Sequence, residues 1–392
     1  MNSSDIVSTM MQVPLSLNHL LDRAGILFPD NEVISRLPDK TYLHHTYGDI
    51  YRRTRQLAQA LTELGLQAGD RVATLCWNHH VHLECYFGIP AAGGVMHTLN
   101  LRLSPDEIAW IVNDAQDRFL IVDDVLLPLL AQFKDNCKFE KIIVVPFTGN
   151  KYSGPELDYE DLLAAANMRA FAYAKHHEDD AVSMCYTSGT TGKPKGGMHS
   201  HHGLVFTVRG YNTLIARDER DECMCFLPLC HIAERMGGEY FSMYTGAKLN
   251  FVENPETVPE NVREIAPTVF GGVPRLWEKF YSAVTISVQE AGAVQQALYR
   301  WAIGVGHDVA QRVLDGQPVG AWLRFKYHVA GVASLDNVRR FIGIHRCRFL
   351  ITGAAPIAPD LIRWYLDGKP QHAQPALLEG WRGELCGHLM LE

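Results

Sequence analysis

The sequence has no excess of basic residues. Its 392 residues include 36 Lys and Arg against 44 Asp and Glu, which gives a formal net charge of −8 at pH 7. Proteins that bind nucleic acids usually present a basic surface to the phosphate backbone. The composition therefore predicts no nucleic-acid partner.

The sequence also lacks the segments that direct a chain into or across a membrane. No run of about 18 apolar residues occurs, and residues 1–21 lack the cationic start and apolar core of a secretory signal. The nine cysteines are odd in number and scattered, unlike the paired set of a disulfide framework. We expect a cytoplasmic location, and leave open both a peripheral contact with a membrane and a homodimer.

One cysteine cluster has the residue types of a zinc site. Cys223, Cys225 and Cys230 precede His231, and thiolate and imidazole are common ligands of zinc. However, Cys223 and Cys225 alternate with apolar neighbours in a strand-like pattern, and free cysteine commonly packs as a small apolar side chain. Packing is therefore the favoured interpretation, with zinc as the alternative.

Residues 184–197 are the stretch that folding alone explains least well. They follow an apolar run typical of a strand and are rich in glycine, hydroxyl and lysine side chains. Glycine lets the backbone approach a ligand closely, while hydroxyl and ammonium groups donate hydrogen bonds to an anion. The residues expected to bind phosphate in this way are Thr187, Ser188, Gly189, Thr190, Thr191, Gly192, Lys193 and Lys195. The alternative is a solvated, flexible turn.

A Walker A loop does not fit this stretch. That loop requires Gly, four residues, Gly-Lys and then Ser or Thr. Here Thr187 stands at the first glycine position, and Pro194 follows Lys193. A nucleotide hydrolase of the P-loop type is therefore disfavoured.

The stretch instead resembles the phosphate-loop signature of the AMP-forming adenylation superfamily. The match covers residues 186–196, Tyr-Thr-Ser-Gly-Thr-Thr-Gly-Lys-Pro-Lys-Gly. This superfamily includes acyl-CoA synthetases, luciferases and the adenylation domains of peptide synthetases. The resemblance implies that the loop holds the β- and γ-phosphates of ATP, and that Lys193 contributes to catalysis.

Short apolar strands and capped amphipathic helices alternate in the first part of the chain. Strands are expected at residues 71–76, 119–122 and 142–145, and helices after the N-cap signals at Thr46 and Ser104. Such alternation predicts an α/β fold whose parallel sheet carries helices on both faces. The phosphate loop would then lie at the carboxyl end of a strand, before a helix capped by Ser200.

The resemblance implies two doubly wound parallel-sheet lobes, which form the large N-terminal domain of adenylate-forming enzymes. The acidic residues 177–180 are the expected boundary, so that residues 1–180 form its first part and residues 181–392 its second part. The family's small C-terminal domain, with the lysine that assists adenylation, is expected to be absent from these 392 residues. We therefore expect impaired activity.

Two later segments resemble family motifs around the acyl group. Residues 225–235 end a strand in Pro-Leu-Cys-His, which implies that His231 acts in catalysis near the acyl carboxylate and the α-phosphate. A histidine that only closes a strand is the alternative. Residues 267–279 resemble the strand and turn that line the acyl pocket, with Phe270, Gly271, Gly272 and Val273 as the pocket residues. Tight strand packing would also explain the two glycines.

The adenine and magnesium sites are expected towards the end of the sequence. Residues 351–356 resemble the adenine-binding loop, and the residues implied to contact the purine are Gly353, Ala354, Ala355 and Pro356. The next family motif has an aromatic residue that stacks on adenine and a Glu that holds Mg²⁺. Trp381 and Glu384 supply these residue types, although the Thr of the motif is missing and its spacing is altered.

Residues 290–346 form an expected helical insertion. Its apolar residues recur at helical spacing: Val294, Leu298, Trp301, Val305, Val309 and Val313, with a second amphipathic stretch from Trp322. This insertion resembles a segment of long-chain fatty-acyl enzymes, whereas residues 1–200 resemble medium-chain ligases. The acyl chain length stays open, as does the choice between a hairpin that covers the sheet and a membrane-surface role.

Taken together, the resemblance implies an AMP-forming fatty-acid–CoA ligase for medium or long chains. Its small-molecule ligands would be a fatty acid, ATP, Mg²⁺ and CoA, and the reaction would pass through an acyl-adenylate. A catalytically inactive remnant that still binds nucleotide or a partner subunit is the alternative from another functional class.

Overall fold

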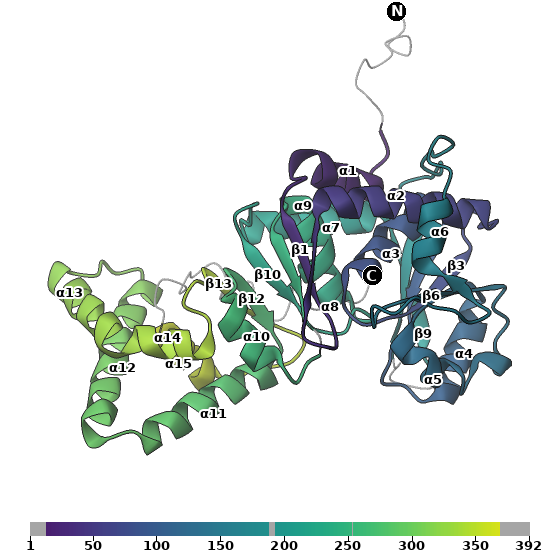
Figure 1. Cartoon of the computed structure of the whole chain (residues 1–392). Coiled ribbons are helices and arrows are strands. Elements are labelled where there is room, and N and C mark those ends of the chain that lie inside the picture. The colour runs from purple at the N-terminus through teal and green to yellow at the C-terminus, as the bar shows by residue number, and fades with distance from the viewer. Residues whose placement is uncertain (1–12, 188–192, 253, 369–392) are drawn as a thin grey trace, which may run out of the picture. The chain divides into compact units, whose positions relative to one another are not determined.

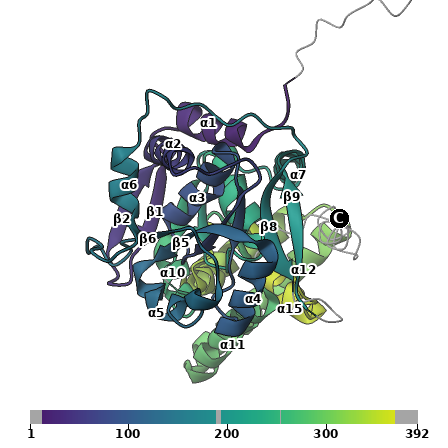
Figure 2. The same cartoon turned by 90° about the vertical axis from the view of Figure 1, so that its right-hand side faces the viewer.

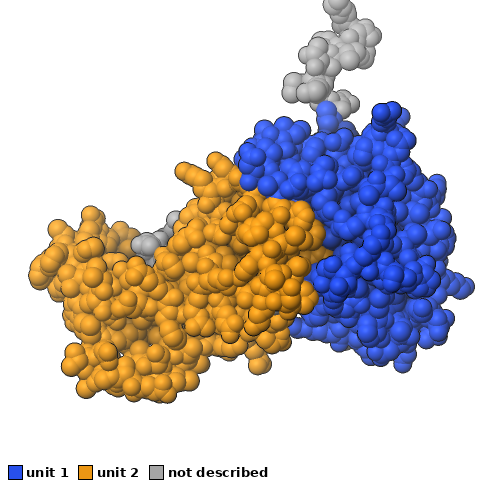
Figure 3. Space-filling model, in the orientation of Figure 1, with its two compact units in different colours: residues 1–30, 46–77, 81–210 blue, residues 31–45, 78–80, 211–392 orange. Residues whose placement is uncertain are grey.

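The computed structural model describes residues 13–187, 193–252 and 254–368. Seven predicted site residues lie outside this part of the chain: Ser188, Gly189, Thr190, Thr191, Gly192, Trp381 and Glu384. The chain divides into two compact units, shown in blue and orange in Figure 3. Unit 1 comprises residues 1–30, 46–77 and 81–210, and unit 2 comprises residues 31–45, 78–80 and 211–392. The main division follows residue 210, and the division of the family's domain at residue 180 stays a prediction.

Unit 1 is built around a mainly parallel sheet. Among the described residues the sheet has seven strands, in the order β7-β6-β5-β3-β4-β8-β9. Figure 1 labels β3, β6 and β9 of this sheet, and Figure 2 labels β5, β6, β8 and β9. Neighbouring strands are parallel as far as β8, and β9 pairs antiparallel with β8. The strands are β3 (Arg71–Leu75), β4 (Val95–Thr98), β5 (Asp117–Asp123), β6 (Lys141–Val145), β7 (Leu157–Asp158), β8 (Ala181–Thr187) and β9 (Lys195–Ser200).

Helices accompany these strands along the chain. They are α1 (Leu17–Leu27), α2 (Tyr47–Glu63), α3 (His80–Ala91), α4 (Pro105–Ala115), α5 (Leu127–Leu130), α6 (Tyr159–Ala165) and α7 (His201–Leu214), with short 3₁₀ turns at Asp124–Leu126 and Lys134–Asn136. Apolar residues of α4 and α5 pack with those of β3, β5 and β6 in one buried cluster. The alternation of strands and helices confirms the predicted α/β class for this unit.

Capping residues fix where two of these helices begin. Before α2, the Thr46 hydroxyl accepts a hydrogen bond from the backbone of Asp49 at 3.2 Å, and the Asp49 carboxylate accepts one from the backbone of Thr46 at 3.1 Å. Ser104 and Glu107 form the same reciprocal pair before α4. Each pair satisfies N–H groups that the first helical turn leaves without partners. Both predicted helix starts are confirmed.

The segment after the phosphate loop differs from the prediction. Residues 195–200 form strand β9 and do not lead directly into a helix; Tyr186 lies opposite Gly196, and Thr187 lies opposite Lys195. Ser200 nevertheless caps α7, because its hydroxyl accepts a hydrogen bond from the backbone of Gly203 at 3.1 Å. The glycines of β9 give no apolar alternation, so only the pairing with β8 reveals the strand.

Unit 2 contains two smaller sheets within the described residues. In one, with the order β10-β11-β1-β2, β11 pairs in parallel with both β10 and β1; in the other, β12 and β13 pair in parallel. The strands are β1 (Glu32–Arg36), β2 (Tyr42–Thr46), β10 (Glu222–Cys225), β11 (Lys248–Phe251), β12 (Val269–Gly272) and β13 (Phe349–Thr352). These parallel pairings confirm the second parallel-sheet lobe.

The segment predicted as a helical insertion, residues 290–346, is helical over most of its length in unit 2, and its status as an insertion within the family stays a prediction. Its helix α12 packs against α13 and α15, and Val305 and Val309 are buried, whereas Val294 and Trp301 are exposed. The helices of unit 2 are α8 (Ile232–Glu234), α9 (Phe241–Thr245), α10 (Val258–Ile265), α11 (Pro274–Glu290), α12 (Ala293–Leu314), α13 (Ala321–Ala330), α14 (Asp336–Ile342) and α15 (Pro359–Gly368), with π-helical turns η4 (Arg235–Tyr240) and η5 (Gly331–Leu335). Within the described residues, no helix combines the length and the apolarity that a membrane span needs.

Candidate active site

The described ends of the predicted phosphate loop lie on two antiparallel strands. Thr187 ends β8 opposite Lys195, which begins β9, so these two ends of the loop lie side by side. Thr187, Lys193 and Lys195 are all exposed. One hydroxyl and two ammonium groups are therefore available to an anionic ligand at this end of the two strands.

Helix α4 anchors this end of the two strands. The Tyr186 hydroxyl donates a hydrogen bond to the Asp114 carboxylate at 2.7 Å, and the Lys193 ammonium lies 5.1 Å from the centre of the Trp110 ring. The rings of Trp110 and Tyr186 meet edge to face. Gly196 leaves room for this arrangement, because a Cβ there would lie 3.2 Å from the Tyr186 ring. Figure 2 shows α4 beside the two strands.

The sequence analysis did not anticipate a role for α4. Trp110 and Asp114 are four residues apart, which places them on one face of the helix. This spacing is a weak signal, because any pair of residues four apart in a helix has it. Only the tertiary contacts with Tyr186 and Lys193 distinguish these two residues from ordinary surface positions.

A buried pair of polar side chains, His97 and Asp117, lies next to Tyr186. The Nδ1 atom of His97 is 2.8 Å from a carboxylate oxygen of Asp117, and both side chains are almost completely buried. Burial raises the pKa of Asp117, and the adjacent His97 opposes that rise. The centre of the His97 ring lies 5.1 Å from the centre of the Tyr186 ring. The end of β8, which carries Tyr186, therefore packs against the buried His97 side chain.

In unit 2, His231 stands between β10 and α8. It is exposed, and its backbone N–H donates to the carbonyl of Pro228 at 3.0 Å, which closes a turn in the connecting segment. The nearby Cys223, Cys225 and Cys230 are buried free thiols. Burial raises the pKa values of Cys223 and Cys225, as expected for thiols that pack among apolar side chains. Their environment supports the packing interpretation.

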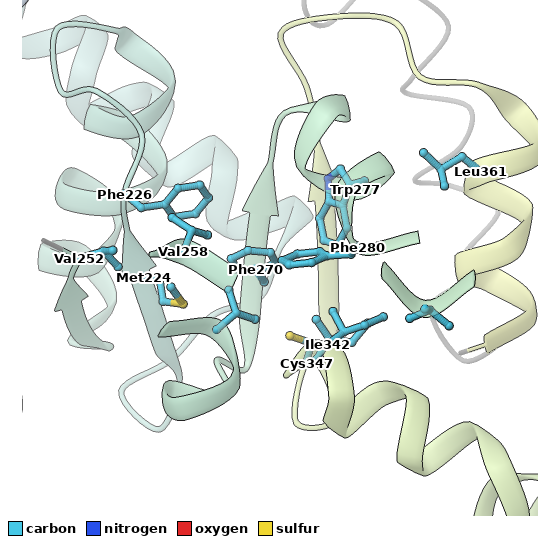
Figure 4. Packing of buried hydrophobic residues seen from close by; sticks show 13 residues of the cluster. Met224, Phe226, Val252, Val258, Phe270, Trp277, Phe280, Ile342, Cys347 and Leu361 are labelled. Carbon is cyan, nitrogen blue, oxygen red and sulfur yellow. The ribbon is translucent and has the colours of Figure 1, made fainter. Parts of the chain in front are cut away.

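The predicted acyl-pocket residues lie on β12 and at the start of α11. Phe270 is buried in an aromatic cluster: its ring stacks on Phe226 with centres 5.6 Å apart and meets Trp277 edge to face (Figure 4). A Cβ at Gly272 would lie 2.9 Å from the side chain of Leu276. Tight packing therefore accounts for Gly272 and Phe270, and the assignment of Phe270, Gly271, Gly272 and Val273 to an acyl pocket stays a prediction.

The predicted adenine loop follows the neighbouring strand. β12 and β13 pair in parallel with Gly272 opposite Thr352, so Gly353 begins the loop beside the end of β12. Ala354, Ala355 and Pro356 are exposed. Ala354 has a φ of 67°, a left-handed conformation that costs a residue with a Cβ some backbone strain. An exposed, strained turn of small residues suits close approach by a flat ligand.

Unit 2 thus brings three of the predicted segments together. The segment that leads to His231 meets β12 through Phe226 and Phe270, and β12 lies beside the strand that carries residues 353–356. The predicted phosphate loop belongs to unit 1.

Comparison with known proteins decides the family. The model of the family described as AMP-binding enzyme matches residues 21–387. The chain belongs to this family. The resemblance inferred from residues 186–196 is confirmed, since the match spans almost the whole chain.

Curated relatives of this AMP-binding enzyme include two bacterial ligases. The long-chain-fatty-acid–CoA ligase of Thermus thermophilus is 38% identical over 278 residues, which are 69% of this chain and 50% of that protein. The 3-methylmercaptopropionyl-CoA ligase of Ruegeria lacuscaerulensis is 33% identical over 308 residues, which are 76% of this chain and 56% of that protein. The chain thus spans about half the length of these relatives.

Solved structures support the fold. The inhibitor-bound N-terminal domain of FACL13 from Mycobacterium tuberculosis matches 89% of this chain and 72% of that chain, with a TM-score of 0.63 and 20% identity. At this identity the comparison supports the architecture alone. It matches the expectation that the described lobes correspond to the large N-terminal domain of adenylate-forming enzymes.

Proposed function

We propose that this AMP-binding enzyme activates a medium- or long-chain fatty acid. In the first step the carboxylate attacks the α-phosphate of ATP, which forms acyl-AMP and releases pyrophosphate. In the second step the CoA thiol attacks the acyl carbonyl, which forms acyl-CoA and releases AMP and a proton. The observation that carries the proposal is the pairing of β8 and β9, which leaves Thr187, Lys193 and Lys195 of the resembling signature exposed at one end of these strands.

The proposed roles follow from the chemistry of these residues. Pyrophosphate leaves with negative charge, and preorganised donors and cations lower the free energy of such a transition state. Lys193 and Lys195 would bind the β- and γ-phosphates, and His231 would lie near the carboxylate and the α-phosphate. ATP would require Mg²⁺, for which Glu384 is the proposed ligand, and residues 353–356 with Trp381 would hold adenine.

The names of the relatives support a fatty-acid substrate but differ in chain length. One relative is the long-chain ligase of Thermus thermophilus, and the medium-chain-fatty-acid–CoA ligase of Ectopseudomonas oleovorans is 29% identical over 310 residues. The Ruegeria relative is named for a short thioether acid. The substrate assay therefore has to compare chain lengths directly.

Isotope exchange between ATP and pyrophosphate tests the proposal. Exchange should depend on added carboxylic acid, and octanoate or palmitate should support it better than 3-methylmercaptopropionate. Hydrolysis of ATP without any fatty acid would contradict the proposal. Stabilisation by ATP against heat, without exchange for any acid, would instead favour an inactive, nucleotide-binding remnant.

We further propose that α13 makes the peripheral membrane contact. Its solvent-facing side carries Trp322, Phe325 and Val329, and Val332 extends this apolar stripe into η5; Trp322 and Val332 are each 67% exposed. The opposite side is also apolar, because Leu323 and Tyr327 pack with residues of α12. One apolar side is thus used for packing, and the other stays exposed among the described residues.

Charge near this stripe favours an anionic bilayer as its partner. No Asp or Glu occurs in residues 316–335, although the chain as a whole has a net charge of −8. Arg324 and Lys326 lie in this segment, and the Lys326 ammonium is 5.7 Å from the centre of the Trp322 ring. Exposed aromatic residues flanked by cations are typical of a helix that lies in the membrane interface.

Vesicle sedimentation tests this contact. The chain should bind vesicles that contain phosphatidylglycerol more tightly than vesicles of phosphatidylcholine alone, and high salt should weaken the binding. Replacing Trp322 and Phe325 together with Asp should weaken it at least about tenfold, since two buried aromatic side chains contribute more than the 1.4 kcal/mol that this factor represents. Phe206→Asp is the control, because Phe206 is an equally exposed aromatic residue of α7.

Equal binding of the double variant would contradict the assignment. A change from dimer to monomer in the double variant, without any loss of vesicle binding, would assign the stripe to a second copy of the chain. The homodimer that the sequence left open would then have its interface at α13.

A further inference from the structure

The segment that carries His231 is short and irregular. It leaves β10 after Cys225 and runs from Phe226 to His231; we call residues 226–231 the histidine loop. A side chain that acts on a reacting phosphate must be held within a fraction of an ångström. None of its residues belongs to a helix or strand of the described structure, so contacts other than a regular hydrogen-bond ladder must hold its backbone.

Glu234 supplies one of these contacts. Its side chain is buried, and an Oε2 atom accepts a hydrogen bond from the backbone N–H of Leu227 at 3.2 Å. The backbone of Phe226 also interacts with this carboxyl group. Gly238 leaves the required space, because a Cβ there would lie 2.6 Å from Oε1 of Glu234. The π-helical turn η4 therefore accommodates a carboxyl group directed at the histidine loop.

Two further side chains hold the same loop. The Nε atom of the fully buried Arg235 donates to the carbonyl of Leu229 at 2.7 Å. The amide of Asn78 donates to the carbonyl of Leu227 at 2.8 Å. Both polar backbone atoms of Leu227 are thus bonded to side chains from other parts of unit 2.

Burying carboxyl and guanidinium groups costs free energy, and apolar residues of the same volume would often stabilise the fold as well. Their presence at buried positions therefore argues that they do more than stabilise the fold. Burial raises the pKa of Glu234 to about 7, and raises that of Glu239 well above its usual range against the opposing effect of Arg235. Glu234 ends α8 and Glu239 lies on the η4 turn that follows it. The hydrogen bond to the histidine loop is made by Glu234.

We propose that Glu234 and Arg235 are positioning residues for His231. They hold the backbone of the histidine loop, and they affect adenylation only through the placement of the imidazole. The inference rests on the proposed role of His231 in adenylation. It assigns roles to two residues of the segment 225–235 for which the resemblance implied none.

Removing the hydrogen-bond acceptor at position 234 tests the proposal. Glu234→Met preserves the volume of the side chain, and it should lower kcat for fatty-acid-dependent exchange by about 10- to 100-fold, as expected for a displaced reacting group. The KM for ATP should change less than about twofold, because the phosphate contacts stay intact. Glu234→Gln retains a carbonyl oxygen that can accept from Leu227, so it should keep kcat within about threefold of the original value.

Glu239→Gln is the matched control. Glu239 is also buried and lies on η4, the π-helical turn that directly follows Glu234 at the end of α8, so this variant removes a similar buried carboxyl group. It should leave kcat within about threefold of the original value, since a factor of three is below the effect of one lost hydrogen bond of about 1 kcal/mol. A loss as large as that of Glu234→Met would contradict the proposal, because the effect would then belong to the helix as a whole. If Glu234→Met does not fold, Glu234→Ala takes its place.

A double variant separates positioning from a general structural effect. If Glu234 acts through His231, Glu234→Met should cost little further activity in a His231→Ala background. Additive losses would overturn the proposal.

Amide hydrogen exchange of Leu227 gives a readout that needs no activity. The exchange rate should increase at least about tenfold in Glu234→Met, as the loss of one hydrogen bond of about 1.4 kcal/mol allows. It should stay unchanged in Glu239→Gln.

The two readouts distinguish this inference from the proposed function. Absence of fatty-acid-dependent exchange in the unaltered chain would count against the proposed function, and the exchange of the Leu227 amide would still decide whether Glu234 holds the loop. Unchanged protection of that amide in Glu234→Met would overturn the inference even if the unaltered chain is fully active.

Discussion

Replacing Arg53 with alanine is expected to lower the free energy of unfolding by about 3–5 kcal/mol, because it leaves a buried carboxylate without its cation. In unit 1, the Nε atom of Arg53 donates to Glu84 at 2.6 Å, and its terminal nitrogens donate to Glu160 at 2.7 and 2.8 Å. The Tyr159 hydroxyl donates to Glu84 at 2.6 Å. This network joins helices α2, α3 and α6.

The burial of Glu84 makes this effect large. Its side chain is 0% exposed, and burial raises its pKa while Arg53 opposes that rise. Without Arg53, the carboxyl group must either stay charged in a medium of low polarity or bind a proton. The melting temperature should fall by roughly 6–20 °C, at about 2–4 °C for each kcal/mol in a domain of this size. Thermal unfolding followed by circular dichroism measures it.

The adjacent Arg52 provides the matched control. It pairs with Asp49 on the same helix at 3.1 Å, but the Arg52 side chain is 60% exposed. Exposed pairs of this kind contribute about 0–1 kcal/mol, so Arg52→Ala should have little effect. In the combined variant Arg53→Met and Glu84→Gln, the glutamine still accepts from Tyr159, and the loss should be smaller than in Arg53→Ala. Equal losses in Arg52→Ala and Arg53→Ala would contradict the argument.

Local signals were sufficient to predict much of this fold. Thr46 with Asp49 and Ser104 with Glu107 combine an N-cap side chain with a carboxylate three residues later, and both form the expected reciprocal bonds. The apolar strands of unit 1 were predictable for the same reason, since burial on both faces of a parallel sheet requires apolar side chains throughout. Neither inference needs information about distant residues.

Contacts between distant residues were not predictable. β9 has no apolar alternation, so its strand conformation depends on pairing with β8. Trp110 precedes Lys193 by more than eighty positions, and only the folded unit brings the two side chains together. The division of the chain after residue 210 depends on which segments pack together, which local sequence signals do not show.

The candidate site shows the same limit. The exposed turn at residues 353–356 and the exposed Lys193 lie where a signature predicts ligand contacts. Phe270, by contrast, is packed between Phe226 and Trp277, because an aromatic residue on a short strand serves a core as readily as a pocket. The roles of Glu234 and Arg235 depend on hydrogen bonds to a backbone several residues away, which sequence spacing does not reveal.

Replacing Lys193 with alanine should have the largest effect on the proposed reaction. If its ammonium neutralises the leaving pyrophosphate, the rate of fatty-acid-dependent exchange should fall by about 10²–10³-fold, as found for the loss of one preorganised donor. The affinity for ATP should fall at least about tenfold, which at saturating ATP lowers the stabilisation of the folded chain by about 1.4 kcal/mol. Calorimetry with and without ATP measures this second effect and does not require turnover.

Two comparisons decide whether the effect belongs to the phosphate loop. Lys151 is an exposed lysine of unit 1 that pairs with Asp161 at 2.8 Å, and Lys151→Ala should leave both ATP affinity and exchange unchanged. Trp110→Ala removes the ring beside the Lys193 ammonium but keeps the charge, so it should weaken ATP binding by less than about tenfold, in line with 0.5–1 kcal/mol for a partly exposed cation–π contact. A loss in Trp110→Ala as large as that in Lys193→Ala would show that the pairing of β8 and β9 has collapsed. Normal ATP stabilisation in Lys193→Ala would show that this lysine does not bind the nucleotide.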